Sequence, residues 1–169
     1  MKLGLLTAPF PETPLDEVAQ WTADNGITAI EIACWPASSG DTRRYAGTSH
    51  IDVDGISDMK ASEIAGSIAA KGLELSGLGY YPNPLHPDPD HARMVIDHLK
   101  KVIVAAGKMN VPVVNTFMGA DAAKSQDENW ETATKVWPEI IACAEENGVK
   151  IAIENCPMIF SRDEWPSGH

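Results

Sequence analysis

The chain has 169 residues and 44% of them are hydrophobic, so it is long enough to bury one sizeable core. It carries 24 Asp and Glu residues against 13 Lys and Arg, and the formal net charge of −11 repels phosphate backbones and anionic membrane surfaces. We therefore expect neither nucleic acid nor a membrane as a partner.

The cysteines and the N-terminus bear on the cellular compartment. Cys34, Cys143 and Cys156 are odd in number and have no CxxC spacing, which predicts neither a disulfide framework nor a thiolate zinc site. The apolar run that ends before Pro9 is too short for a signal-peptide core, and no later run approaches a membrane span. These features predict a cytoplasmic protein.

The first half of the chain alternates short apolar runs with helical patterns. An apolar run over 3–7 predicts a buried strand. A helix over 14–25 follows, with Thr13 as its expected cap, and a second strand is predicted over 27–33. The connection over 34–57 has no clear period, and we interpret it as a loop of the functional site because connections of that length are usually functional.

The second half repeats the same alternation with longer helices. A rigid loop of aromatic residues and prolines, 80–87, separates a third strand from the longest amphipathic pattern. The predicted elements are, in order, a helix over 58–71, a strand over 73–78, a helix over 89–107, a strand over 112–117, a helix over 129–147 and a strand over 150–154.

Strands that alternate with helices at this spacing indicate right-handed βαβ units and a parallel sheet. An open doubly wound sheet usually has a glycine-rich phosphate turn after its first strand, and the sequence TAPFP offers none. We therefore predict an α/β fold of the TIM (β/α)8 barrel type. A complete barrel takes about 250 residues, so residues 1–169 should form a single partial barrel domain, truncated after strand five, that supplies the first five strands and four helices.

Reacting groups of a barrel lie at the C-terminal ends of its strands. Glu154 follows an apolar strand, where a carboxylate must be hydrated, ion-paired or bound to a metal. A structural ion pair with Lys or Arg of a neighbouring strand is the alternative. Glu31 lies further from the C-terminal end of its own strand and is a weaker candidate for a functional carboxylate.

Other side chains near strand ends are candidates for substrate contact. Trp35 and Tyr80 could stack on a sugar ring or seal the barrel end by ordinary packing. His86 follows the third strand in NPLHPD and Asn115 ends the fourth. We expect His50 to reach the site from the long connection, and His98 to lie on the surface of its helix.

Several segments support a family resemblance that covers essentially the whole chain. They are MKLGLLTAPFP, IEIACWP, LSGLGYYPNPLHPD, VVNTFMG, and IAIENCPM followed by DEWPSGH. In these segments the chain resembles the sugar phosphate isomerase/epimerase superfamily, the xylose-isomerase-like barrels that include ketose 3-epimerases and inosose dehydratases.

The resemblance implies a divalent metal ion, with manganese expected first and magnesium, cobalt or zinc as alternatives. Members of the superfamily hold it with a Glu of a mid-barrel strand and then an Asp, a His and a second Glu. Only the first ligand maps onto this chain, at Glu154, and the others would lie beyond His169. By the same resemblance, substrate-binding residues are Trp35, Tyr80, His86 and Asn115.

The implied reaction of a sugar isomerase or epimerase is proton abstraction next to a carbonyl through an enediolate, with Glu154 as an acid/base group. An inosose-type dehydratase begins in the same way, and a non-catalytic half-barrel assembly module is the rival without turnover. The related apurinic endonucleases are disfavoured because VVNTFMG lacks their histidine. The expected ligand is a neutral sugar or cyclitol, and the expected protein partner is a second copy or the missing barrel half.

Overall fold

The fold is described by a computed structural model that covers residues 2–37 and 47–155. Its sheet has five parallel strands in the order β1-β2-β3-β4-β5, so every strand pairs with its neighbours in the chain. The strands are β1 (Gly4–Leu6), β2 (Ala29–Ala33), β3 (Glu74–Gly79), β4 (Val113–Thr116) and β5 (Lys150–Ile153). The helices are α1 (Leu15–Asp24), α2 (Asp58–Ala70), α3 (Pro89–Lys108) and α4 (Gln126–Glu146).

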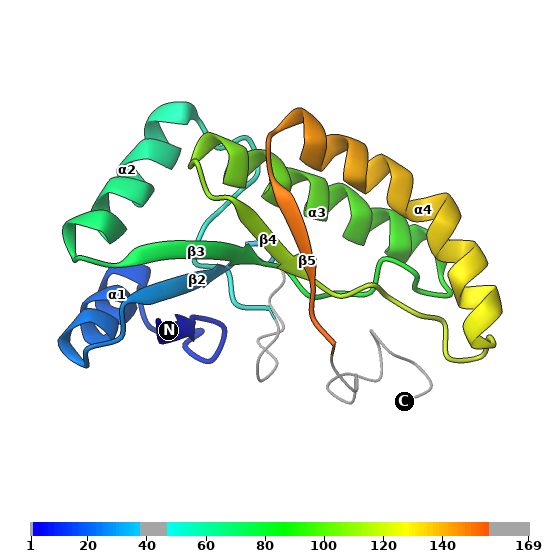
Figure 1. Cartoon of the computed structure of the whole chain (residues 1–169), viewed down its shortest axis with the longest axis horizontal. Helices are drawn as coiled ribbons and strands as arrows, with labels where there is room; N and C mark the ends of the chain where they lie inside the picture. The colour runs from blue at the N-terminus through cyan, green and yellow to red at the C-terminus, as the bar shows by residue number, and fades with distance from the viewer. Residues whose placement is uncertain (1, 38–46, 156–169) are drawn as a thin grey trace.

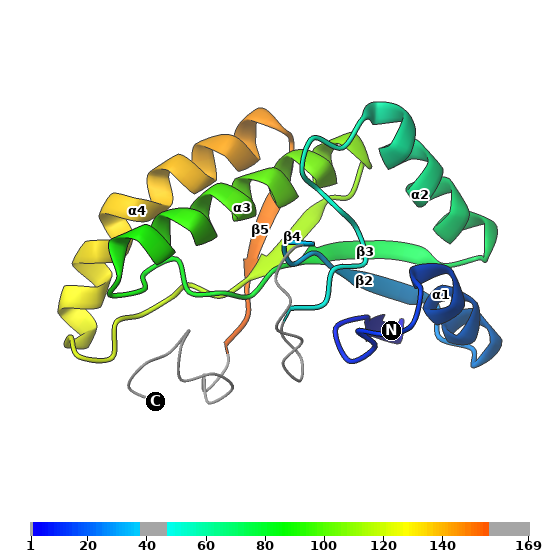
Figure 2. The same cartoon turned by 180° about the vertical axis from the view of Figure 1, so that it is seen from behind.

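This arrangement confirms the predicted α/β fold of a partial TIM barrel, with each of the strands β1 to β4 followed by a helix. Helices α2, α3 and α4 lie together along one side of a curved sheet (Figures 1 and 2). Ile30, Ile32, Leu78 and Val114 are fully buried. Since side chains alternate along a strand, these residues point to the helix side, and the residues between them point to the opposite, inner face.

Two helix starts differ from the prediction. Helix α4 begins at Gln126 and not at 129, because Ser125 and Glu128 form a reciprocal capping box that fixes an earlier first turn. The expected cap of α1 at Thr13 is wrong: the N-cap is Pro14, which makes no side-chain cap hydrogen bond. These differences leave the order of the elements unchanged.

The long connection after β2 is partly integrated into the fold where the structure describes it. Ile51, Val53 and Ile56 are buried in the core. Ser49 forms an isolated antiparallel β-bridge with Cys34. His50 in this segment is hydrogen-bonded to the Thr7 hydroxyl and to the carbonyl oxygens of two residues in the loop after β1. The connection therefore ties the first two strand ends together.

Helix α3 lies between two other helices, and this position corrects one expectation. His98 is only 9% exposed, and its Nε2 donates a hydrogen bond to the Cys34 carbonyl at 2.8 Å. The expectation of a surface residue failed because α3 packs against both α2 and α4 as well as the sheet, so more of its circumference is buried than a single apolar stripe indicates. None of the described helices is long and apolar enough to cross a membrane.

Candidate functional site

Strand register brings three polar side chains to the inner face of the sheet. Glu31 pairs with Gly77, Gly79 pairs with Asn115, and Asn115 pairs with Ala152. Residues paired in a parallel sheet point to the same face, and so do residues two apart in one strand. Glu31 and Asn115 therefore share the inner face, and Glu154, two residues beyond Ala152, continues it.

Glu31 is the centre of a hydrogen-bonded cluster on this face. The Tyr81 hydroxyl donates to its Oε1 at 2.5 Å. The side chain of Asn115 also hydrogen-bonds to the Glu31 carboxylate and favours its charged form. Carboxylate, phenol and amide thus come from β2, from the loop after β3 and from β4, so that only the assembled sheet forms the cluster.

Two glycines of β3 make room for these side chains. A Cβ on Gly79 would overlap the Glu31 carboxylate oxygen and lie 2.9 Å from Cε2 of Tyr81. A Cβ on Gly77 would lie 2.6 Å from Nδ2 of Asn115. Neither glycine has a positive φ, so the space they leave, and not their backbone freedom, is what this site requires.

Burial dominates the electrostatics of the cluster. It raises the pKa of Glu31, and the negative charge of Glu154 raises it further, while the hydrogen bonds from Tyr81 and Asn115 act in the opposite direction. Burial also raises the pKa of Tyr81, and the neighbouring Glu31 carboxylate adds to this shift. The phenol therefore stays protonated and remains a hydrogen-bond donor.

Glu154 lies just past β5 and is exposed. Its backbone N–H donates to the Thr116 carbonyl at 2.9 Å, which extends the β4–β5 ladder by one residue. No described Lys or Arg forms an ion pair with its carboxylate. The negative charge of Glu154 raises the pKa of Glu31, so the two carboxylates are close enough to interact electrostatically.

Aromatic rings form one side of the cluster. Trp35 is 7% exposed, and its ring centroid lies 5.9 Å from that of Tyr81 and 5.7 Å from that of Tyr80. Tyr80 is buried, with its ring 4.6 Å from the ring of His98 under α3. Tyr81 continues to Phe117, whose ring centroid is 4.9 Å away. Of the two adjacent tyrosines, it is Tyr81 whose hydroxyl reaches the cluster.

The remaining predicted contact, His86, lies at the start of α3. Its Nδ1 accepts a hydrogen bond from the backbone N–H of Asp88, the N-cap of that helix, at 3.1 Å. Its ring centroid lies 4.3 Å from that of His91. Nearby, the buried Asn83 side chain bonds to Ala120 and so ties the loops after β3 and β4 together.

Neither Tyr81 nor Phe117 stands out as a candidate in the sequence. Strand alternation offered a signal for both, because Tyr81 is two residues beyond Gly79 and Phe117 two residues beyond Asn115. Extending the inner-face alternation past the end of each strand would have placed both rings beside the polar cluster. The choice between Tyr80 and Tyr81 depended on knowing which residues of β3 face inwards.

The described residues hold no group of three or more His, Cys, Asp or Glu side chains arranged to bind a metal ion. Glu154 is an exposed carboxylate at a strand end, and oxygen donors of this kind suit hard or borderline divalent cations. The chemistry of the Glu154 carboxylate therefore fits a ligand of such an ion.

Comparison with known proteins identifies the family and the fold. The family described as xylose isomerase-like TIM barrel matches residues 19–165. No curated protein matches the chain. Among solved structures, D-psicose 3-epimerase from Clostridium cellulolyticum H10, crystallised with D-tagatose, has a TM-score of 0.66 at 21% identity and is matched over 97% of this chain and 54% of its own.

Two further solved structures share the fold of this chain. A xylose isomerase domain protein from Planctomyces limnophilus has a TM-score of 0.66 at 12% identity, over 96% of this chain and 56% of its own. The IolI protein, solved with a bound zinc atom, has a TM-score of 0.64 at 18% identity, over 90% of this chain and 51% of its own. At these identities the similarity establishes the fold alone, and the chain spans about half the length of each structure.

Proposed function

Because the chain belongs to the xylose isomerase-like TIM barrel family, we propose that it is the N-terminal part of a divalent-metal-dependent sugar isomerase or epimerase. The reaction is proton abstraction next to a carbonyl, through an enediolate. The observation that carries the proposal is the position of Glu154, at the end of β5 on the same face as the Glu31 cluster.

Glu154 is the metal ligand of this half and one of the two acid/base carboxylates. Its exposure and the absence of an ion pair with a described cation leave its oxygens open for both roles. Manganese is the expected ion, with magnesium, cobalt or zinc as alternatives. When bound, such an ion supplies Lewis-acid polarisation of the substrate carbonyl. The zinc atom of the IolI structure supports metal binding on this scaffold.

The neighbouring residues bind and orient the substrate. Tyr81, held by Glu31, and the Asn115 amide present hydrogen-bonding groups to the hydroxyls of a neutral sugar or cyclitol. Trp35 and Tyr81 offer aromatic surface for the apolar face of a sugar ring. The predicted contacts Tyr80 and His86 act from the edge of the site, since Tyr80 packs behind Trp35 and His86 lies at the start of α3. The D-tagatose of the epimerase structure supports a sugar ligand.

The protein works in the cytoplasm, without nucleic acid or membrane, and pairs with a second copy or with the missing half of the barrel. A dehydratase of the inosose type would use Glu154 in the same first step and then expel a hydroxyl group. A half-barrel assembly module without turnover is the non-enzymatic alternative, and the experiment below separates it from both enzymes.

The test measures the exchange of carbon-bound hydrogen of the substrate with solvent. The protein is purified from cells that express the whole gene. D-fructose or D-tagatose is incubated with the Mn²⁺-loaded protein in D₂O, and deuterium incorporation next to the carbonyl is measured together with metal content. We expect exchange that Glu154→Gln abolishes, with a loss of bound metal. Glu131→Gln, which neutralises an exposed carboxylate of α4, is the matched control and should change neither.

Exchange without a change in product composition would indicate enolisation alone. With an inosose in place of the ketose, loss of water would assign the dehydratase. A protein with neither bound metal nor exchange, or one in which Glu154→Gln and Glu131→Gln behave alike, would contradict the proposal and favour the assembly module.

A further inference from the structure

One buried side chain joins two of the loops that border the inner-face cluster. Asn83 lies in the loop after β3 and is 0% exposed. Its Nδ2 donates a hydrogen bond to the Ala120 carbonyl at 2.7 Å, and its Oδ1 accepts one from the Ala120 N–H at 3.0 Å. Two paired residues of an antiparallel sheet exchange bonds in the same way. We call this pair of bonds, which connects the loop after β3 to the loop after β4, the amide clamp.

The loop after β4 approaches Asn83 as closely as its backbone allows. A Cβ on Gly119 would lie 2.7 Å from Oδ1 of Asn83 and 2.9 Å from the backbone nitrogen of Leu85. Gly119 also has a φ of +87°, which favours glycine. The Leu85 N–H donates to the same Oδ1 at 3.0 Å. Both loops are therefore shaped around this one side chain.

The amide clamp requires a side chain that both donates and accepts. An amide carries a donor and an acceptor on one planar group, as a peptide bond does. An ionised aspartate has the same shape but only accepts, so at position 83 it would turn a second oxygen towards the Ala120 carbonyl. A buried polar group that loses its partner is strongly unfavourable. The clamp is therefore specific to asparagine at this position.

The residues that the amide clamp holds belong to the inner-face cluster. Tyr81 precedes Asn83 by two residues, and the proline between them fixes one of the intervening backbone angles. Phe117 precedes Ala120 by three residues, and its ring centroid lies 4.9 Å from that of Tyr81. The clamp thus ties together the two loops whose rings meet beside Glu31.

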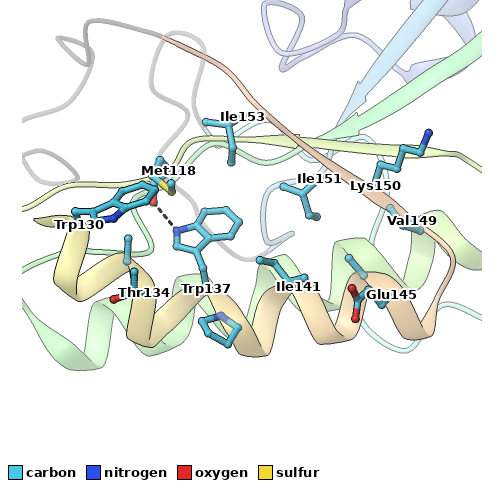
Figure 3. Close-up of a pocket in the computed structure, with 13 residues that line it drawn as sticks. Met118, Trp130, Thr134, Trp137, Ile141, Glu145, Val149, Lys150, Ile151 and Ile153 are labelled. Carbon is cyan, nitrogen blue, oxygen red and sulfur yellow. Dashed lines mark hydrogen bonds between the residues drawn. The ribbon is translucent and has the colours of Figure 1, made fainter.

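The loop after β4 is also anchored from the helix side. The indole Nε1 of Trp137, in α4, donates a hydrogen bond to the Met118 carbonyl at 3.0 Å (Figure 3). Met118 directly follows Phe117. The loop after β4 is thus fixed to α4, and the amide clamp fixes the loop after β3 to it in turn. The position of Tyr81 therefore depends on Asn83 as well as on the hydrogen bond to Glu31.

We propose that Asn83 is a positioning residue of the sugar site. By joining the two loops it holds the Tyr81 ring against Phe117, with the Tyr81 hydroxyl directed at Glu31. Asn83 is itself fully buried and acts through Tyr81, so it governs affinity for the sugar and not the abstraction of a proton. This inference rests on the proposed function, because it takes the inner-face cluster as the place where the sugar binds.

The test measures binding of D-tagatose to the Mn²⁺-loaded whole protein by calorimetry, together with KM and kcat for hydrogen exchange. In Asn83→Asp we expect Kd and KM to rise about tenfold. The kcat and the Mn²⁺ content should stay unchanged, because Glu154 is held by the backbone of Thr116 and not by the clamp. Asn129→Asp is the matched control. The Asn129 side chain bonds to the backbone of Asp121 within the loop after β4, so this change should leave Kd and KM as in the parent.

Two glycine variants test the amide clamp without changing Asn83. Gly119→Ala places a methyl group against Asn83 Oδ1 and should also raise Kd and KM. Gly72→Ala is its control, because Gly72 has a φ of +75° but a Cβ there meets nothing within 4 Å. It imposes a similar backbone strain without the contact, and should leave Kd unchanged. This pair keeps the proposal testable if Asn83→Asp does not fold.

The outcomes separate this inference from the proposed function. A parent that exchanges hydrogen, with equal Kd values in Asn83→Asp and Asn129→Asp, would overturn the inference alone. A fall in kcat at unchanged KM would also overturn it. A parent that binds D-tagatose without exchange, and more weakly in Asn83→Asp, would contradict the isomerase and support the inference. A parent that neither binds nor exchanges would overturn both.

Discussion

The glycines of β3 allow a quantitative test of the inner-face cluster. In Gly79→Ala the added methyl group would overlap the Glu31 carboxylate and lie 2.9 Å from Tyr81 Cε2, so at least one of these side chains must move. Overpacking of this kind typically costs about 1–3 kcal/mol. Because φ of Gly79 is not positive, none of this cost arises from backbone strain.

Gly66→Ala is the matched control for the same chemical change. Gly66 lies within α2, and a Cβ there meets nothing within 4 Å. Alanine at an unstrained helix position stabilises a protein by about 0.4–1 kcal/mol. The two substitutions should therefore change the free energy of unfolding in opposite directions.

Urea unfolding of both variants, followed by far-ultraviolet circular dichroism, measures these changes. If the cost arises at Glu31, the Glu31→Ala background should reduce the penalty of Gly79→Ala, with a coupling of about 0.5–3 kcal/mol. A Gly79→Ala chain as stable as the parent would refute the reasoning that the glycine exists to leave room for the cluster. A penalty unchanged in the Glu31→Ala background would assign the clash to Tyr81 alone.

Two further predictions concern pH. The pKa of Glu31 is raised from 4.5, chiefly by burial, so between 4.5 and that higher value the folded state holds more protons than the unfolded state and stability falls as pH rises. Urea midpoints measured across this window should fall less in Glu31→Gln than in the parent, and parallel pH profiles would contradict the assignment. Burial lowers the pKa of His98 below 6.5, so stability should fall as pH drops from 6.5 through the lowered value. His98→Gln keeps a donor for the Cys34 carbonyl and should weaken this dependence of stability on pH. An unchanged loss of stability at acidic pH would mean that other groups cause it.

The order and type of the elements could be predicted from the sequence because they depend on local patterns. Apolar runs of strand length, helical periods and turn residues recur along the chain, and they determined five strands, four helices and a parallel sheet. Glu154 was identified for the same reason, since a carboxylate directly after an apolar strand stands out in the linear sequence. Its proposed role still rests on family membership and on residues from another part of the barrel.

Only the tertiary structure decided which side chains meet. Glu31, Tyr81 and Asn115 come from three segments, and their contact depends on strand register and on the space above Gly77 and Gly79. A single sequence does not encode register locally, because a shift of one residue turns every side chain of a strand to the other face. For the same reason, the choice between Tyr80 and Tyr81 and the burial of His98 under neighbouring helices became visible only once the sheet and its helix layer were assembled.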